Sequence, residues 1–372
     1  MSRIKIMSVF GTRPEAIKMA PLVKALENCE QFESFVCVTG QHREMLDQVL
    51  DIFGISPDYD LDIMKDGQTL TDITIRALEG LKTVFRDAGP DMVLVHGDTT
   101  TTFAGALAAF YHKIKIGHVE AGLRTYNKEE PFPEEMNRVL TSSLADLHFA
   151  PTRKARENLL REGIKENSIF VTGNTVIDSL QYTLNDSHVF DEPSLNAIDF
   201  RGSRVITLTA HRRENLGEGL LAICEAVAQI VGSHEDVEVV YPMHKNPSIR
   251  KVVEASLGQH PRIHLVEPLN IRDMHNLLNR SYLVMTDSGG LQEEVPSMGK
   301  PVLVLRNVTE RPEGIEAGTL KLAGNRKDRI VELATELLIS EKAYQRMAVA
   351  TNPFGDGTAS SRIVEAILTS FY

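Results

Sequence analysis

The sequence predicts an α/β protein built from two doubly wound parallel-sheet domains, and three observations support this fold class. Short apolar runs, each the length of a buried strand, alternate with segments whose apolar residues repeat at helical spacing. Gly, Pro, His or acidic residues follow these runs, as expected where a parallel strand enters a turn. The alternation stops after residue 174 and restarts at residue 203. We expect an N-terminal domain (1–174), a link region (175–202) and a C-terminal domain (203–354).

The first half repeats a strand followed by a helix. Its first apolar run ends at Gly11, and Pro14 then stands near the first position of a helix, where proline is favoured. Gly89-Pro90, by contrast, ends the helix predicted at residues 70–88. Strands are predicted at residues 3–10, 34–39, 91–95, 115–119, 147–150 and 169–172. Helices are predicted at residues 15–26, 44–53, 70–88, 99–111, 138–145 and 155–161.

The second half repeats this order. Strands are predicted at residues 204–209, 237–241, 262–266, 282–285 and 301–305. Helices are predicted at residues 219–231, 273–279 and 291–298, with a final helix over about 355–372 that we expect to pack back on the first domain. Two halves of similar size imply a central cleft faced by the strand ends of both.

Composition narrows the classes of function. The chain has 372 residues, is 42% hydrophobic and 24% charged, and carries a formal net charge of -11. This charge argues against general binding to nucleic acid or to an anionic membrane. The three cysteines have no paired spacing, so we expect neither a disulfide framework nor a zinc site. The start of the chain lacks the apolar length of a signal peptide, so we expect a cytoplasmic protein.

Three acidic residues follow predicted strands or a proline-rich loop. Asp98 and Glu120 come directly after two consecutive strands, and Glu134 follows Pro131-Phe132-Pro133. Chemistry in parallel α/β sheets gathers at the carboxyl ends of strands. The sequence therefore predicts an acid cluster that acts on a substrate. A divalent metal is a weaker alternative, because these acids lack a compact metal-ligand spacing.

Two turns are suited to phosphate. Ser288, Gly289 and Gly290 stand between a strand and a helix, where bare backbone amides can approach an anion. Glu294, or Glu293 beside it, could bind ribose hydroxyls, and a plain glycine turn is the alternative interpretation. The first strand leads into Gly11-Thr12-Arg13 in a similar way, but without the GxGxxG fingerprint of a dinucleotide site.

One histidine and several cations complete the predicted site. His211 follows the first strand of the second half and could transfer a proton near neutral pH, or simply cap the next helix. Arg13, Lys18, Arg138 and Arg311 lie near predicted turns or helix starts. Each could be a solvated charge by itself, but as a set they suit a diphosphate.

Taken together, the motifs resemble one family. They are GTRPEAIKMAPLV, HGDTTTT, GHVEAGLRT, PFPEEMNR, TAHRREN, TDSGGLQEE, TERPEGIEAGT and the tail NPFGDGTASSRIVEAI. They span the chain from Phe10 to about Ile367 and resemble the bacterial non-hydrolysing UDP-N-acetylglucosamine 2-epimerases. The resemblance implies the GT-B architecture, which is two Rossmann-like domains around a central cleft, and a homodimer.

The resemblance also implies an activity, the conversion of UDP-N-acetylglucosamine (UDP-GlcNAc) to UDP-N-acetylmannosamine (UDP-ManNAc) for cell-envelope polysaccharides. It implies no NAD and no metal, with UDP eliminated to a glycal and then added back. By the same resemblance, Asp98, Glu120, Glu134 and His211 match the catalytic residues. The residues that match nucleotide-sugar positions are Arg13, Lys18, Arg138, Ser288, Gly289, Gly290, Glu294 and Arg311. Uracil is expected beside the loop after Pro268.

Many members of this family also bind UDP-GlcNAc as an allosteric activator. The resemblance implies a pocket formed by Gln41, Arg43 and His244. Relatives often carry Gln where this chain has Glu44 and Arg where it has Gly67. Retention of the activator is therefore a hypothesis for this chain.

Three other classes share parts of this pattern. A hydrolysing epimerase would release UDP and free N-acetylmannosamine. A GT-B glycosyltransferase would share the nucleotide site but present an acceptor surface, for which the sequence offers no basic or apolar patch. A UDP-sugar sensor would not need all of the predicted catalytic residues. Amide variants of the acids separate a sensor from an enzyme.

Overall fold

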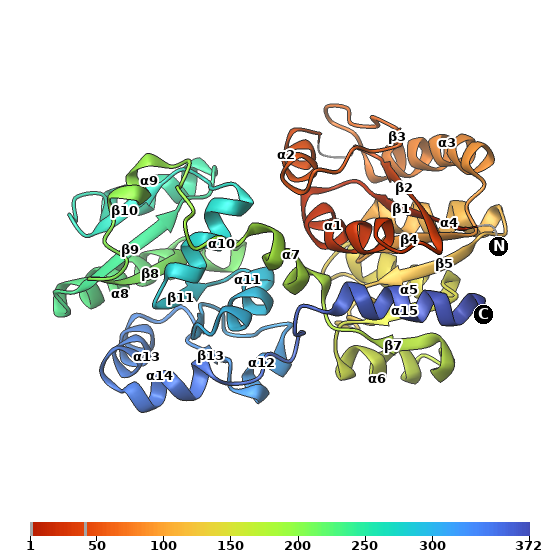
Figure 1. The fold of residues 1–372 in the computed structure, drawn as a ribbon. Coiled ribbons are helices and arrows are strands. Elements are labelled where there is room, and N and C mark those ends of the chain that lie inside the picture. Colours follow the sequence, from red (N-terminus) through yellow and green to blue (C-terminus); the bar gives the residue numbers. More distant parts are fainter. Residues whose placement is uncertain (1–2, 41–42) are drawn as a thin grey trace. The chain divides into compact units, whose positions relative to one another are not determined.

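The computed structural model describes residues 3–40 and 43–372, with the side chains of residues 43–45 left out. The chain divides into two compact units (Figure 1). The first comprises residues 1–182 and 354–372, and the second comprises residues 183–353. The boundary therefore lies inside the expected link region, whose residues are shared between the units. No helix in the described part of the chain is long and apolar enough to cross a membrane.

The described part of the first unit contains a seven-stranded parallel sheet. Its strand order is β3-β2-β1-β4-β5-β6-β7, so the direction of winding reverses between β1 and β4. The strands are β1 (Ile4–Phe10), β2 (Phe32–Val38), β3 (Tyr59–Asp60), β4 (Met92–His96), β5 (Lys115–Val119), β6 (Leu147–Ala150) and β7 (Ile169–Val171). The helices are α1 (Arg13–Glu27), α2 (Arg43–Phe53), α3 (Leu70–Ala88), α4 (Thr100–Tyr111), α5 (Glu134–Leu144), α6 (Arg153–Arg161), η1 (Glu166–Ser168), α7 (Thr175–Thr183) and α15 (Ala359–Phe371).

Helices cover both faces of this sheet. Helices α1, α2 and α15 bury their apolar side chains against one face, and α3 and α4 cover the other. The last helix, α15, thus belongs to the first unit although it ends the chain (Figure 1). The buried carboxylate of Asp178 holds its start, accepting hydrogen bonds from the backbone N–H groups of Ser360 (2.7 Å) and Ala359 (3.2 Å).

The described part of the second unit contains a six-stranded parallel sheet with the order β10-β9-β8-β11-β12-β13. Here the winding reverses between β8 and β11. The strands are β8 (Arg204–Thr209), β9 (Val237–Pro242), β10 (Ile263–Val266), β11 (Leu283–Thr286), β12 (Val302–Val304) and β13 (Leu320–Leu322). The helices are η2 (Pro193–Ala197), η3 (Arg213–Asn215), α8 (Glu218–Ser233), α9 (Pro247–Leu257), α10 (Ile271–Arg280), α11 (Gly289–Glu294), η4 (Val295–Met298), α12 (Pro312–Ala317), α13 (Lys327–Ile339) and α14 (Glu341–Ala348).

The core of the second unit lies on both faces of its sheet. Apolar residues of α8, α9 and α13 pack against one face, while α10, α11 and residues 190–198 cover the other. The predicted α/β class with two doubly wound parallel sheets is confirmed. The sequence analysis assigned no element to β3, α7, α9, α12, β13, α13 or α14, and it began α5 four residues too late.

Candidate active site

In the first unit, three adjacent strands end at the point where the winding reverses. Strands β1, β4 and β5 are neighbours, and Arg13, Asp98 and Glu120 follow their carboxyl ends. Ligands of open α/β sheets bind at such reversal points. The fold therefore brings two of the three predicted acids to the same edge of the sheet.

Asp98 is held by helix α5. Its carboxylate oxygen Oδ2 lies 2.6 Å from Nη2 of Arg138, and the side-chain amide of Asn137 donates to its backbone carbonyl at 2.9 Å. A quarter of the Asp98 side chain is exposed. Burial raises the pKa of Asp98 above its usual range, while the Arg138 guanidinium opposes this shift. Such a carboxyl group is suited to proton transfer.

Glu120 is more deeply buried, with 8% of its side chain exposed. It forms an ion pair with Lys18, and Nδ2 of Asn174 donates to its Oε2 at 2.6 Å. Its backbone has a φ of +63°, which is rare for a residue with a side chain. Such strain persists only where the surroundings enforce it, and it occurs often at functional sites. Lys18, which the sequence analysis assigned to the nucleotide sugar, thus pairs with one of the predicted acids.

Glu134 is the first residue of α5, the helix that holds Asp98. Its Oε2 is buried and has no hydrogen-bond partner. A buried carboxylate oxygen without a donor is costly, and a ligand can supply the missing donor. The next residue has a different role, because the Glu135 carboxylate accepts from the backbone N–H groups of Thr125 (3.0 Å) and Tyr126 (2.9 Å).

Glu15 is a buried residue that the sequence analysis did not assign to the site. Its carboxylate accepts hydrogen bonds from both backbone N–H groups of Gly11 and Thr12, and from the hydroxyls of Thr12, Thr99 and Thr102. It thereby fixes the turn before Arg13 to the start of α4, just beyond Asp98. Burial raises the pKa of Glu15. The capping-box spacing from Thr12 to Glu15 was the available sequence signal.

The second unit has its own reversal point, between β8 and β11, and His211 and Asp287 follow these strands. The fully buried Asp287 accepts at Oδ2 from the backbone N–H groups of His211 and Arg212, both at 2.8 Å. Its other oxygen, Oδ1, lies 3.7 Å from Nδ1 of His211. Asp287 thus orients His211, a role that the sequence analysis missed. Burial lowers the pKa of His211, and the Asp287 carboxylate opposes this.

The glycine turn Ser288-Gly289-Gly290 leads from β11 into α11. A Cβ added to Gly289 would lie 3.7 Å from the guanidinium carbon of Arg311 and 3.8 Å from a guanidinium nitrogen of Arg212. Two cations therefore border an open stretch of backbone, which suits a phosphate group. Arg311 was predicted, whereas Arg212 is added by the structure.

The two glutamates after this turn have separate roles. Glu293 is buried and its Oε1 lies 2.5 Å from Nε of Arg311, so it holds that guanidinium. Glu294 lies beside Gly290 instead, since a Cβ on Gly290 would be 3.3 Å from its Oε1. Its Oε2 is 3.2 Å from Nε2 of His275. Glu294 is thus the better placed of the two for a ribose.

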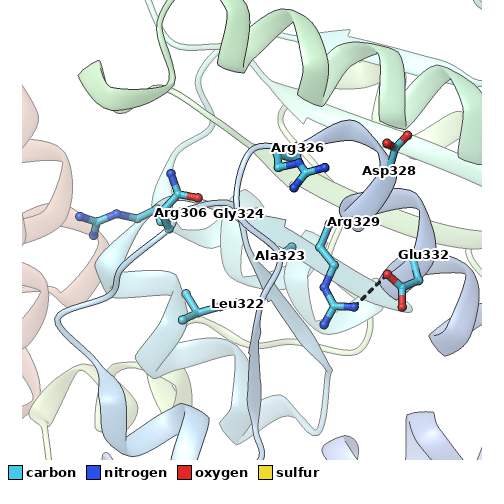
Figure 2. Close-up of a pocket in the computed structure, with 9 residues that line it drawn as sticks. Arg306, Leu322, Ala323, Gly324, Arg326, Asp328, Arg329 and Glu332 are labelled. Atoms are coloured by element: carbon cyan, nitrogen blue, oxygen red, sulfur yellow. Dashed lines mark hydrogen bonds and ion pairs between the residues drawn. The ribbon is translucent and has the colours of Figure 1, made fainter.

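A hollow of about 440 Å³ opens near the ends of β12 and β13 (Figure 2). None of the predicted site residues lines it. Two of the three arginines that line it pair with acids. Arg306 Nε lies 2.5 Å from Glu214 Oε1. Arg329 Nη1 lies 2.8 Å from Glu332 Oε2 (Figure 2). Arg306 Nη1 also lies 3.0 Å from Glu310 Oε2. Through Glu214 and Glu310, Arg306 links the loop that carries His211 to the loop that carries Arg311.

The predicted activator residues are only partly described. Gln41 lies outside the described residues, and so do the side chains of Arg43 and Glu44. The ring of His244 stacks on that of His211, with centroids 5.2 Å apart and an interplanar angle of 17°. Within residues 3–40 and 43–372, no cluster of three or more His, Cys, Asp or Glu side chains is arranged to hold a metal ion.

These features define a class of protein, a two-domain α/β enzyme of GT-B type with an acid cluster in one domain and an arginine-flanked glycine turn in the other. Comparison with known proteins is consistent with this class. The family model described as UDP-N-acetylglucosamine 2-epimerase matches residues 24–368. The chain belongs to this family, which confirms the resemblance inferred from the motifs.

Close relatives match over nearly their full length. The UDP-N-acetylglucosamine 2-epimerase of Bacillus subtilis is 58% identical over 368 residues, covering 99% of this chain and 96% of the relative. The enzyme of that name from Escherichia coli K12 is 54% identical, covering 98% of each.

Two solved structures with ligands are also similar. The UDP-GlcNAc 2-epimerase of Neisseria meningitidis bound to UDP-GlcNAc superposes with a TM-score of 0.89 at 49% identity, covering 98% of this chain and all of that one. A Staphylococcus aureus protein, MnaA, in complex with UDP has a TM-score of 0.88 at 54% identity, covering 99% of this chain and 97% of that one.

Proposed function

We propose that this protein reversibly converts UDP-GlcNAc to UDP-ManNAc by inverting carbon 2 of the sugar, as a non-hydrolysing epimerase. The observation that carries the proposal is the acid cluster of the first unit, in which cations hold Asp98 and Glu120. Family membership and relatives named for the same activity support it.

The chemistry explains why carboxylates are needed. The proton on carbon 2 has no neighbouring carbonyl, so simple removal and return is too slow. We propose elimination: the C1–O bond breaks with its electron pair leaving on UDP, a base removes the proton from carbon 2, and a C1=C2 double bond forms. The reverse addition delivers a proton to the other face of carbon 2 while UDP returns to carbon 1. The positive charge that develops at carbon 1 favours a nearby carboxylate.

We assign the proton transfers to Asp98 and Glu134, and charge stabilisation to Glu120. The raised pKa of Asp98 supports its role, because a group that transfers protons must gain and lose them readily. The unpaired Oε2 of Glu134 supports the second assignment. The Lys18 ion pair favours a Glu120 carboxylate that stays charged.

The nucleotide is assigned mainly to the second unit. Ser288, Gly289, Gly290 and Arg311 would hold the diphosphate, with Glu294 on the ribose, and Arg13 and Arg138 of the first unit would contribute positive charge. His211, oriented by Asp287, would act at the leaving phosphate oxygen. We expect no NAD and no metal in this reaction.

We further propose a cytoplasmic homodimer whose product supplies cell-envelope polysaccharides, on the basis of the family resemblance. Sedimentation equilibrium tests the dimer. Inactivating the gene tests the supply role, and we expect N-acetylmannosamine to disappear from hydrolysates of the envelope.

UDP-GlcNAc is also proposed as an activator, supported by the stacking of His244 on His211. The rate measured with UDP-ManNAc alone should then rise sigmoidally as UDP-GlcNAc accumulates. A hyperbolic curve that added UDP-GlcNAc leaves unchanged would contradict activation.

The test of the proposed function is an incubation of purified, dialysed protein with UDP-GlcNAc, without NAD or added metal, followed by chromatography of the nucleotide sugars. We expect UDP-ManNAc to appear and both sugars to reach the same ratio from either direction. UDP with free N-acetylmannosamine would identify a hydrolysing enzyme instead. Unchanged UDP-GlcNAc would favour a sensor, or a transferase that lacks its acceptor.

A further inference from the structure

A buried histidine that none of the assignments above uses lies inside the acid cluster. His96 is the last residue of β4 and stands two residues before Asp98. It is 3% exposed, and its Nε2 lies 3.9 Å from Oε2 of Glu120. Both of its ring nitrogens are buried without a hydrogen-bond partner. Unpaired buried polar atoms are uncommon and costly, so this arrangement needs an explanation.

Two neighbouring histidines show what a purely structural role looks like. On β5, Nε2 of His118 bonds to the carbonyl of Gly97 at 2.8 Å. On β6, Nε2 of His148 bonds to the carbonyl of Ser142 at 2.9 Å. Each ring uses Nε2 to tie down a backbone carbonyl. The Nε2 of His96 has no such bond and faces a carboxylate instead.

The charged groups around His96 favour a neutral ring. Burial lowers the pKa of His96 to about 4, with the Glu120 carboxylate opposing this and Lys18 of α1 adding to it. The ring of His118 also lies close enough to interact. A neutral imidazole has one N–H donor and one lone pair. At neutral pH the ring can thus give a hydrogen bond to Glu120 without placing a second positive charge beside Lys18.

We propose that His96 is a positioning residue for Glu120, and that in solution its Nε2–H donates to Oε2 of the Glu120 carboxylate, with or without the sugar. This inference rests on the proposed function, in which Glu120 stabilises charge on the sugar. Oε2 already accepts from Lys18 and Asn174. A third donor on the same oxygen fixes the direction of the carboxylate.

The consequence is a change in the proton affinity of Glu120. A donor that bonds to the charged form of a carboxyl group lowers its pKa. Removing the His96 donor therefore raises the pKa of Glu120, and a more alkaline pH is needed to ionise it. Lys18 acts in the same direction as His96, whereas the nearby Asp98 acts in the opposite direction, and neither is altered when His96 is replaced.

The test compares two substitutions of His96 in the full-length protein. His96→Phe keeps the ring but removes the donor, whereas His96→Gln places an amide N–H near the position of Nε2. His148→Gln is the control for loss of a buried imidazole elsewhere on the same sheet. The first readout is the ¹³C NMR titration of the Glu120 carboxyl group in protein labelled on glutamate, assigned with Glu120→Gln.

We expect His96→Phe to raise the Glu120 midpoint by about one pH unit, a tenfold change in proton affinity, and His96→Gln to restore it. In the epimerase assay, kcat of His96→Phe should fall about tenfold with KM nearly unchanged. The acidic limb of its pH–rate profile should move to higher pH. His148→Gln should show neither change. An unaltered Glu120 midpoint in His96→Phe would overturn the proposal. So would a Glu120 midpoint in His96→Gln that is raised as far as in His96→Phe.

A measurement on the unsubstituted protein covers the case in which His96→Phe fails to fold. The ¹⁵N shifts of the His96 ring at pH 7 should show a neutral imidazole with the proton on Nε2. A charged ring, or a proton on Nδ1, would contradict the proposal. Neither NMR experiment needs substrate, so they test the link from His96 to Glu120 even if the chromatographic assay shows that the protein is not an epimerase.

Discussion

The two units repeat the same scaffold, but the acidic residues that follow strands beside each reversal point act in opposite ways. In the first unit, cations hold the carboxylates: Lys18 pairs with Glu120 and Arg138 pairs with Asp98. In the second unit, carboxylates hold donors: Asp287 accepts from the backbone N–H groups of His211 and Arg212, and Glu293 holds the Arg311 guanidinium. One sheet edge thus presents acids and the other presents cations. The fold supplies the edge, and the residues after each strand decide its chemistry.

The largest expected effect separates turnover from binding. Asp98→Asn removes the proposed proton carrier from the first unit but leaves the second unit unaltered, so kcat should fall by about a thousandfold. The dissociation constant for UDP, measured by calorimetry, should stay within a few fold. The exposed Asp51→Asn is the matched control and should retain full activity. An Asp98→Asn enzyme with normal turnover would remove Asp98 from the catalytic set.

The second prediction concerns the stability of the second unit. Arg311→Met leaves the buried Glu293 carboxylate without its cation, which should cost about 3 kcal/mol of unfolding free energy. Adding Glu293→Gln should recover most of that loss while UDP binding stays weak. Urea unfolding followed by hydrogen exchange should place the loss in residues 183–353 alone. Equal losses in both units would contradict the separate roles of their carboxylates.

Acid should weaken the first unit more than the second. Burial lowers the pKa of His96 to about 4 and that of His118 to about 3, from 6.5. In the unfolded chain these histidines bind protons near pH 6.5, whereas in the folded chain they stay neutral. Their contribution to the free energy of unfolding is therefore fully present above pH 6.5 and falls as the pH drops below it. For His96 alone the loss is about 2 kcal/mol between pH 7 and pH 5.

Hydrogen exchange in urea at both pH values measures this loss for each unit. The raised pKa values of Glu15 and Asp98 make the folded first unit more stable as pH falls, which opposes the histidine effect. Both acids are also present in the His96→Gln variant, so a comparison of the two proteins isolates the contribution of His96. The variant should therefore show a flatter pH dependence in the first unit only. Identical slopes for the two proteins would mean that His96 becomes protonated in the folded state.

The smallest effect tests the attachment of the C-terminal helix to the first unit. Asp178→Asn removes the charge that holds the first N–H groups of α15, at a cost of about 1 kcal/mol. Amides of residues 359–371 should exchange faster, with no change in residues 183–353. The exposed Asp186→Asn is the control. Unchanged exchange in α15 would show that apolar packing alone holds this helix.

The sequence predicted that Asp98, Glu120 and His211 follow strands, because each comes after an apolar run of strand length. It did not predict Glu15 or Asp287, since a buried carboxylate that orders backbone N–H groups has no pattern of its own in the sequence. Helix α5 was predicted to start at Arg138, because Pro131 and Pro133 resemble a loop, yet Glu134 is its first residue. Strands β3 and β13 are two and three residues long, too short for a periodic signal.

The most direct test of the central claim, that the acid cluster moves the proton of carbon 2, is proton NMR of UDP-GlcNAc incubated with the protein in D2O. We predict that UDP-ManNAc appears with deuterium at carbon 2, and that the recovered UDP-GlcNAc gains deuterium at the same carbon. UDP-ManNAc that keeps its original proton at carbon 2 would contradict the claim, because inversion would then proceed without exchange of that proton with solvent.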